Sequence, residues 1–305
     1  MGEVIITKTE YKGWKNCIEI SNGIVDLIVT TDVGPRVIRY GFKGKENEFV
    51  EFEEHLGLTG GEDYRIYGGH RLWHSPEHPV RTYQPDNTKV GWRKKKYGVV
   101  LTQDAEPATL IRKEMEVLLD PEGTQVMLQH KLTNTGMWDV ELSAWAISMM
   151  AAGGVGVIPL NARETGLLSN GSISLWPYTK MNDKRVHWGD KYILLSQSEK
   201  ADSAFKIGLP NESGWAAYAN HGHLFVLKFN HDIDMEYPDN NCSYETYTNA
   251  RFMEMESLSP ITLLDPGETV IHTENWSLYD NVEKPKNEKD IDEHIVPLLE
   301  KQPAV

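Results

Sequence analysis

The chain contains 305 residues, of which 40% are hydrophobic and 25% are charged, and its formal net charge is −14. This length allows one large β domain or two ordinary domains, and the balance of residue types is that of a globular protein rather than a disordered one. The excess of acidic groups argues against nucleic acid as a partner, because a nucleic-acid-binding surface needs a basic face.

The cysteines and the N-terminal sequence bear on the compartment. Cys17 and Cys242 are the only two cysteines and lie far apart, so we expect buried thiols and neither a disulfide framework nor a zinc site. Residues 1–14 lack a basic segment followed by an apolar run, and no apolar stretch is long enough to span a bilayer. We therefore expect a cytoplasmic protein with no membrane partner.

Alternation of apolar and polar residues with a period of two recurs along the whole chain. Turn-forming residues, chiefly Asn, Asp, Pro and Gly, bound each alternating segment. Many short strands at near-regular spacing are typical of a β-sandwich or barrel. We therefore expect an all-β protein with one domain over residues 1–283. The clearest strand segments are residues 25–30, 36–42, 113–119, 124–132 and 223–229.

The first stretch whose side chains could take part in catalysis or binding is GGHRLWHSPE at residues 68–77. The glycines make its backbone permissive and Pro76 ends any helix, so we expect a loop or a strand end. Loops with such side chains often carry function. The same residues also suit a surface loop with solvated histidines and a tryptophan that covers a nearby core.

The one basic cluster is WRKKK at residues 92–96. Because strand-like sequence flanks it, we predict a solvated edge strand protected by lysines rather than a phosphate-binding track.

The second informative stretch is RFMEMES at residues 251–257. Along a strand, period two places Glu254 and Glu256 on one face and Met253 and Met255 on the other. If the methionines face the core, the glutamates face outward or into a cleft. The pattern is equally typical of a plain solvent-facing strand surface.

The C-terminal segment 284–305 is the one place with helical periodicity. Its apolar residues at 291, 295, 298 and 299 share one helical face, and Pro297 would kink or end the helix. We expect a short C-terminal helix or tail packed on the outside of the β domain.

Three parts of the sequence resemble the galactose mutarotase (aldose 1-epimerase) superfamily, and the protein resembles an uncharacterised branch of it. Residues 257–279, SLSPITLLDPGETVIHTENWSLY, follow a hydrophobic-Glu pair and resemble the family's C-terminal end. Residues 22–49 resemble its opening strands, and residues 132–150, LTNTGMWDVELSAWAISMM, are similar to its Thr-Asn-Thr segment. The resemblance implies a β-supersandwich with a sugar in a concave cleft across one sheet.

The resemblance also implies catalytic roles. Mutarotases use a glutamate as base on the anomeric hydroxyl and a histidine as acid toward the ring oxygen, and Glu254 matches the family's base. The position of the family's histidine is taken by Trp145, which cannot deliver a proton. His74 and His70 are therefore the candidate acids.

Other residues combine aromatic faces with hydrogen-bond donors and are candidates for holding the sugar. A long loop over buried tryptophans and a plain turn near residue 238 explain some of them equally well. The candidate substrate-binding residues are Arg71, Trp73, Glu256, Trp176, Arg185, Trp188 and Tyr237.

These features predict a carbohydrate-binding, carbohydrate-active protein with mutarotase-like or epimerase-like acid-base chemistry. Two alternatives remain open: a non-catalytic sugar-binding protein, and an oligosaccharide lyase or hydrolase in which two carboxylates flank a cleft. His221 and His223 form an HxH pair, but the carboxylate that should follow it is missing. We expect no metal and no cofactor, a small-molecule sugar or oligosaccharide as partner, and leave open a homodimer.

Overall fold

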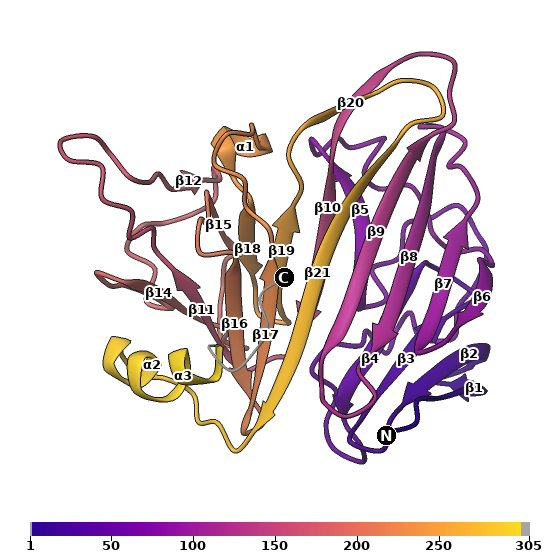
Figure 1. Ribbon diagram of the computed structural model, residues 1–305, viewed down its shortest axis with the longest axis horizontal. Coiled ribbons are helices and arrows are strands. Elements are labelled where there is room, and N and C mark those ends of the chain that lie inside the picture. The colour runs from indigo at the N-terminus through magenta and orange to yellow at the C-terminus, as the bar shows by residue number, and fades with distance from the viewer. Residues whose placement is uncertain (1, 300–305) are drawn as a thin grey trace.

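The computed structural model describes residues 2–299, in which the strands form two antiparallel sheets that pack face to face (Figure 1). One sheet has 11 strands and the other has 10. The expected all-β fold is therefore confirmed, and long-range strand pairing dominates it.

In the 11-stranded sheet, segments from both halves of the chain lie side by side, because β5 and β19 both pair with β10. In spatial order its strands are β1 (Ile5–Tyr11), β2 (Trp14–Ser21), β3 (Val25–Thr30), β4 (Arg36–Phe42), β5 (Gly69–Ser75), β10 (Val140–Met150), β19 (Met253–Leu258), β18 (Tyr244–Thr248), β15 (Phe205–Leu209) and β12 (Ser174–Leu175), with β20 (Thr262–Leu264) paired to β10.

The 10-stranded sheet is centred on two long neighbouring strands, β21 and β9. Its order is β13 (Val186–Trp188), β14 (Tyr192–Ser196), β11 (Val155–Pro159), β16 (Trp215–Asn220), β17 (His223–Phe229), β21 (Thr269–Asp280), β9 (Val126–Asn134), β8 (Ile111–Leu119), β7 (Gly98–Gln103) and β6 (Gly91–Lys95). The basic segment forms β6 at the sheet edge, as predicted, where its lysines face solvent.

The main core lies between the two sheets. We call the side of the 11-stranded sheet that faces this core the interior face, and its other side the outer face. Leu72, Ala144 and Met255 enter the core from the interior face and meet Leu128 and Trp276 of the 10-stranded sheet. Because side chains alternate along a strand, the residues between them form a smaller apolar cluster on the outer face.

The segment 68–77 differs from its prediction, because residues 69–75 form the inner strand β5 rather than a loop, and every residue of β5 is buried. Gly68 and Gly69 both have positive φ, and a side chain on Gly68 would collide with the carbonyl oxygen of Val50. The glycines therefore allow a tight approach to the sheet instead of a mobile loop. The burial comes from neighbours at distant sequence positions.

The helices are short. α1 (Pro238–Asn241) is a single turn beside β15, and α2 (Glu288–His294) and α3 (Val296–Leu299) pack on the outside of the 10-stranded sheet through Ile291 and Ile295 (Figure 1). The expected C-terminal helix is confirmed but divided in two, because α2 ends with Ile295 as its C-cap and α3 begins at the next residue. Pro297 lies in the first turn of α3, where its missing N–H costs little. Residues 300–305 of the predicted tail lie outside the described residues. No helix within residues 2–299 is long and apolar enough to cross a membrane.

Candidate functional site

A dense group of charged and aromatic side chains covers the outer face where β5, β10, β19, β18 and β15 lie side by side. Strand register explains the grouping, because residues paired across neighbouring strands point to the same face. Glu254 is paired with Tyr247, and Tyr247 with Lys206. We call this group the outer-face cluster; it consists of Tyr64, Arg71, Trp73, Trp145, Trp176, Lys206, Glu245, Tyr247, Glu254 and Glu256.

Glu254 is the carboxylate of the cluster that keeps some access to solvent, since its side chain is 13% exposed. One oxygen lies 3.3 Å from Nη2 of Arg71. Burial raises the pKa of Glu254 to about 7 and the neighbouring Glu256 carboxylate adds to this, although Arg71 and Lys206 act in the opposite direction. A carboxyl group with a pKa near neutrality can both accept and return a proton at physiological pH.

Glu256 has a different role, because its side chain is fully buried. Its Oε2 accepts hydrogen bonds from Nε1 of Trp145 at 2.8 Å and from Nζ of Lys206 at 3.0 Å. Lys206 also lies 2.7 Å from Glu245. Although burial alone lowers it, the pKa of Lys206 is raised well above its usual range by Glu256 and Glu245, so the ammonium stays charged. These ion pairs hold Lys206, Glu245 and Glu256 in place in the buried part of the cluster.

Aromatic rings surround these charges. The guanidinium carbon of Arg71 lies 3.9 Å from the ring centre of Trp73, and Trp73 packs edge-on against Trp145 with ring centres 5.3 Å apart. Nζ of Lys206 lies between the rings of Trp145 and Trp176, at 4.8 and 4.6 Å from their centres. Such contacts hold each cation by cation–π attraction as well as by ion pairs.

The structure brings five of the predicted site residues together. Glu254 and Glu256 project from β19, Arg71 and Trp73 from β5, and Trp176 from the segment after β12. The predicted separation of the methionines from the glutamates is confirmed, and Met253 and Met255 are on the face that packs into the core.

The two candidate acids lie on the other face. His70 and His74 alternate with Arg71 and Trp73 along β5, so both imidazoles point into the space between the sheets. His70 bonds to Ser148, and His74 lies near Glu106. Burial holds the pKa of His70 well below its usual range and lowers that of His74 to about 3. Neither histidine can therefore act as an acid beside Glu254, because both imidazoles lie on the opposite face of the sheet.

Three further candidates also lie elsewhere. Arg185 forms an ion pair with Asp183 at 2.8 Å, and Trp188 of β13 donates a hydrogen bond to the carbonyl of Met181. Tyr237 is buried, stacks on a histidine ring and accepts a hydrogen bond from the amide of Asp232. Each is engaged in local structure rather than in the outer-face cluster.

Sequence reasoning missed Tyr64, Lys206, Glu245 and Tyr247. Two signals were available: Lys206 is the one charged residue in the apolar strand FKIGL, and Glu245 and Tyr247 share a face in YETYT. Tyr64 carried no signal, because it lies in an irregular segment and reaches Arg71 only through the tertiary fold.

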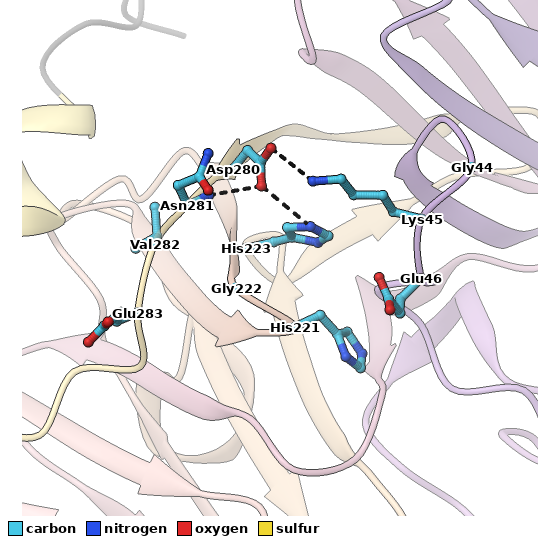
Figure 2. A pocket seen from close by; sticks show the side chains of 10 residues that line it. All are labelled: Gly44, Lys45, Glu46, His221, Gly222, His223, Asp280, Asn281, Val282 and Glu283. Atoms are coloured by element: carbon cyan, nitrogen blue, oxygen red, sulfur yellow. Dashed lines mark hydrogen bonds and ion pairs between the residues drawn. The ribbon is translucent and has the colours of Figure 1, made fainter.

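A cavity of about 750 Å³ lies apart from this cluster, beside the turn between β16 and β17. Figure 2 shows Lys45 and Asp280 pointing toward each other next to His223. Nζ of Lys45 lies 2.9 Å from Oδ2 of Asp280. Nδ1 of His223 lies 2.7 Å from Glu48, whose pKa burial raises to about 8. Among the described residues that line this cavity there is no Trp, Tyr or Phe, so it offers no flat apolar surface for a sugar ring.

The overall structure is similar to galactose mutarotase-like proteins. A galactose mutarotase-like protein from Lactobacillus casei superposes with a TM-score of 0.58 at 11% identity, over 87% of this chain and all of that chain. A galactose mutarotase related enzyme from Lactobacillus acidophilus gives 0.51 at 9% identity, over 89% of this chain and all of that one. A TPR-domain containing protein from Parabacteroides distasonis gives 0.57 at 13% identity, over 99% of this chain and 56% of that one.

These similarities establish the fold, so the chain has the galactose mutarotase-like β-sandwich that its sequence resembles. At the level of sequence, no protein-family model and no curated protein matches.

Proposed function

We propose that the outer-face cluster binds an uncharged pyranose and that Glu254 acts as a general base on one of the sugar hydroxyls. The observation that carries the proposal is a carboxyl group with a pKa of about 7, held beside an arginine and surrounded by tryptophan and tyrosine rings. Aromatic rings can stack on the C–H faces of a sugar, while the charged groups bond to its hydroxyls. The mutarotase-like fold supports this reading.

The charge of the cluster favours a neutral sugar over an acidic one. Arg71 is paired with Glu254, and Lys206 with Glu256 and Glu245, so three carboxylates face two cations. An anionic substrate would have to compete with these carboxylates for the same cations. A neutral sugar can instead accept hydrogen bonds from the cations and donate to the carboxylates.

Ring opening also needs a proton donor, and Tyr64 takes this role. Its hydroxyl accepts a hydrogen bond from Arg71, which also contacts Glu254. Burial raises the pKa of Tyr64, so the phenol keeps its proton at neutral pH. The base and the donor are thus both attached to one guanidinium group.

A second candidate function is sugar binding without turnover. It is favoured by Trp145, which donates to Glu256 at the position where the resemblance expects a catalytic histidine. A hydrolase with Glu254 and Glu256 as its carboxylate pair has less support, because Glu256 is fully buried and already paired with Lys206.

The test combines calorimetry with polarimetry. Binding of D-glucose and D-galactose is measured first, and interconversion of the freshly dissolved α-anomers is then followed with and without the protein. We expect binding and accelerated interconversion, with a loss of about 10²- to 10⁴-fold in rate and retained binding for Glu254→Gln. The matched control is Glu212→Gln, which should behave as wild type, because Glu212 is a partly exposed glutamate that pairs with Arg163 away from the cluster.

The outcomes separate the two candidates. Binding without acceleration by the wild-type protein supports the non-catalytic function, and unchanged activity of Glu254→Gln removes Glu254 from the mechanism. Absence of binding to every neutral sugar tested would contradict the proposal as a whole.

A further inference from the structure

A second polar cluster lies directly behind the first, on the interior face. Three histidines and a glutamate meet there between the two sheets, and all four side chains are buried. His70 comes from β5 of the 11-stranded sheet, whereas His130 and Glu274 come from β9 and β21 of the 10-stranded sheet. We call the group the interior-face cluster; it consists of His70, His130, Ser148, Ser257, His272, Glu274 and Trp276.

Three atoms of the cluster converge on one point. Nε2 of His70 lies 2.7 Å from Nε2 of His130 and 3.9 Å from Oε2 of Glu274. One ligand atom from each of these residues falls within 4.8 Å of the others, and each of the three side chains is buried. Two imidazole nitrogens and a carboxylate oxygen form a donor set typical of Zn²⁺ and of the other late first-row divalent ions.

The groups behind these atoms hold them in orientation. Nδ1 of His130 lies 3.2 Å from the carbonyl oxygen of His272, so it carries the proton and Nε2 presents a lone pair. Nδ1 of His70 lies 2.9 Å from the hydroxyl of Ser148, whose oxygen can accept a hydrogen bond from the Nδ1–H in the same way. Metal-bound histidines usually donate their other ring N–H to such an oxygen.

The carboxylate is anchored as well. Glu274 accepts hydrogen bonds from Oγ of Ser257 at 2.5 Å and from Nε1 of Trp276 at 2.9 Å. Within residues 2–299 no lysine or arginine forms an ion pair with it, and its side chain is 0% exposed. A buried carboxylate without a cation is unfavourable, and a divalent ion at the point of convergence would supply the missing positive charge.

We propose that His70, His130 and Glu274 bind a divalent transition-metal ion of the Zn²⁺ type that links the two sheets. The ion replaces the proton between the two imidazoles, and that proton moves from Nε2 to Nδ1 of His70, which then donates a hydrogen bond to the hydroxyl oxygen of Ser148. Two metal–nitrogen bonds of about 2.0–2.1 Å in tetrahedral geometry need nitrogens about 3.3 Å apart, so the rings have to separate by roughly half an ångström. The site has a structural role beneath β5 and β19, the strands that carry Arg71 and Glu254.

The test uses the full chain, which is refolded so that the ion can enter before the sheets close. Protein unfolded in denaturant with a chelator is refolded with Zn²⁺, with Co²⁺ or without metal, and metal content is measured after gel filtration. We expect one equivalent of retained metal, a higher unfolding temperature than for the metal-free protein, and visible absorption from the Co²⁺ form.

Two variants separate this site from adventitious binding. Glu274→Gln keeps a side-chain oxygen for Ser257 or Trp276 but loses the anionic ligand, and we expect at least a 10-fold lower metal content. Glu48→Gln replaces another buried carboxyl group, which bonds to His223, and should retain the wild-type metal content. If Glu274→Gln does not refold, X-ray absorption of the wild-type Zn²⁺ form decides the matter, since it should show two imidazoles among nitrogen and oxygen ligands.

Three results would overturn the proposal: wild-type protein that retains no metal after refolding, equal metal content in wild type and Glu274→Gln, or an absorption spectrum without two imidazole ligands.

Discussion

The two polar clusters lie on the two sides of the 11-stranded sheet, and the interior-face cluster also includes residues of the sheet packed against it. Glu254 on the outer face and Glu274 in the interior have the same chemistry, and burial raises the pKa of each to about 7. Glu254 keeps partial exposure and a guanidinium partner, whereas Glu274 accepts hydrogen bonds from Ser257 and Trp276 and pairs with no lysine or arginine within residues 2–299. Glu254 can therefore contact a ligand that binds from solution, whereas Glu274 can contact only a group or an ion that is buried during folding.

Tryptophan truncation should give the largest difference between the two faces. Trp276 is fully buried and packs against Tyr40, Phe49 and Phe225, so Trp276→Ala should lower the free energy of unfolding by about 3–5 kcal/mol. Trp73→Ala on the outer face should cost less stability and weaken sugar binding instead. Urea unfolding and calorimetry of both variants test this, and equal destabilisation would show that Trp73 belongs to the core rather than to a binding surface.

His74 provides a pH test of the interior face. Burial lowers its pKa from 6.5 to about 3, so the unfolded chain binds a proton at a higher pH than the folded one. The stability that this group contributes is fully present above pH 6.5 and is lost as the pH falls toward 3, by on the order of 5 kcal/mol at most. His74→Asn should reduce the loss of stability between pH 7 and pH 4.5 relative to wild type.

The matched control is His187→Asn, because His187 is exposed on β13. It should leave the pH dependence of unfolding unchanged. An unaltered slope for His74→Asn would contradict the assignment of His74 to the interior.

Arg71 should set the pH range in which the outer face works. Its guanidinium lowers the pKa of Glu254 against the effect of burial. Without that cation, Arg71→Gln should move the acidic limb of the activity or binding profile upward by about one pH unit. The titration is followed by the rate of anomer interconversion or by sugar affinity. A profile that stays in place would mean that Arg71 positions ligands but does not tune the base.

The sequence predicted those features that depend on short-range periodicity. The alternation in RFMEMES predicted Glu254 and Glu256 on one face and the methionines on the other, and the structure shows that the methionine face packs into the core. The lysine-rich segment was recognised as an edge strand, because exposed strands carry such residues. The resemblance at three places in the chain indicated the fold that the structural comparisons show.

The structure of the segment 68–77 could not be predicted from its local sequence. Its glycines and prolines indicated a loop, but pairing with β4 and β10 made it an inner strand. That change sent Arg71 and Trp73 to the outer face and His70 and His74 to the interior. A shift of one position in register would have exchanged the two pairs.

Local patterns thus determined that this chain forms many short strands, which residues alternate along each strand, and that a helical segment follows the last strand. The tertiary structure alone decided which strands are neighbours and which of their faces meets the core. The reason is that alternation defines two faces of a strand but not which of them is buried, whereas burial depends on partners far away in the chain. His70, His130 and Glu274, separated by 60 and 144 positions, meet only because β5, β9 and β21 come from two sheets that pack together.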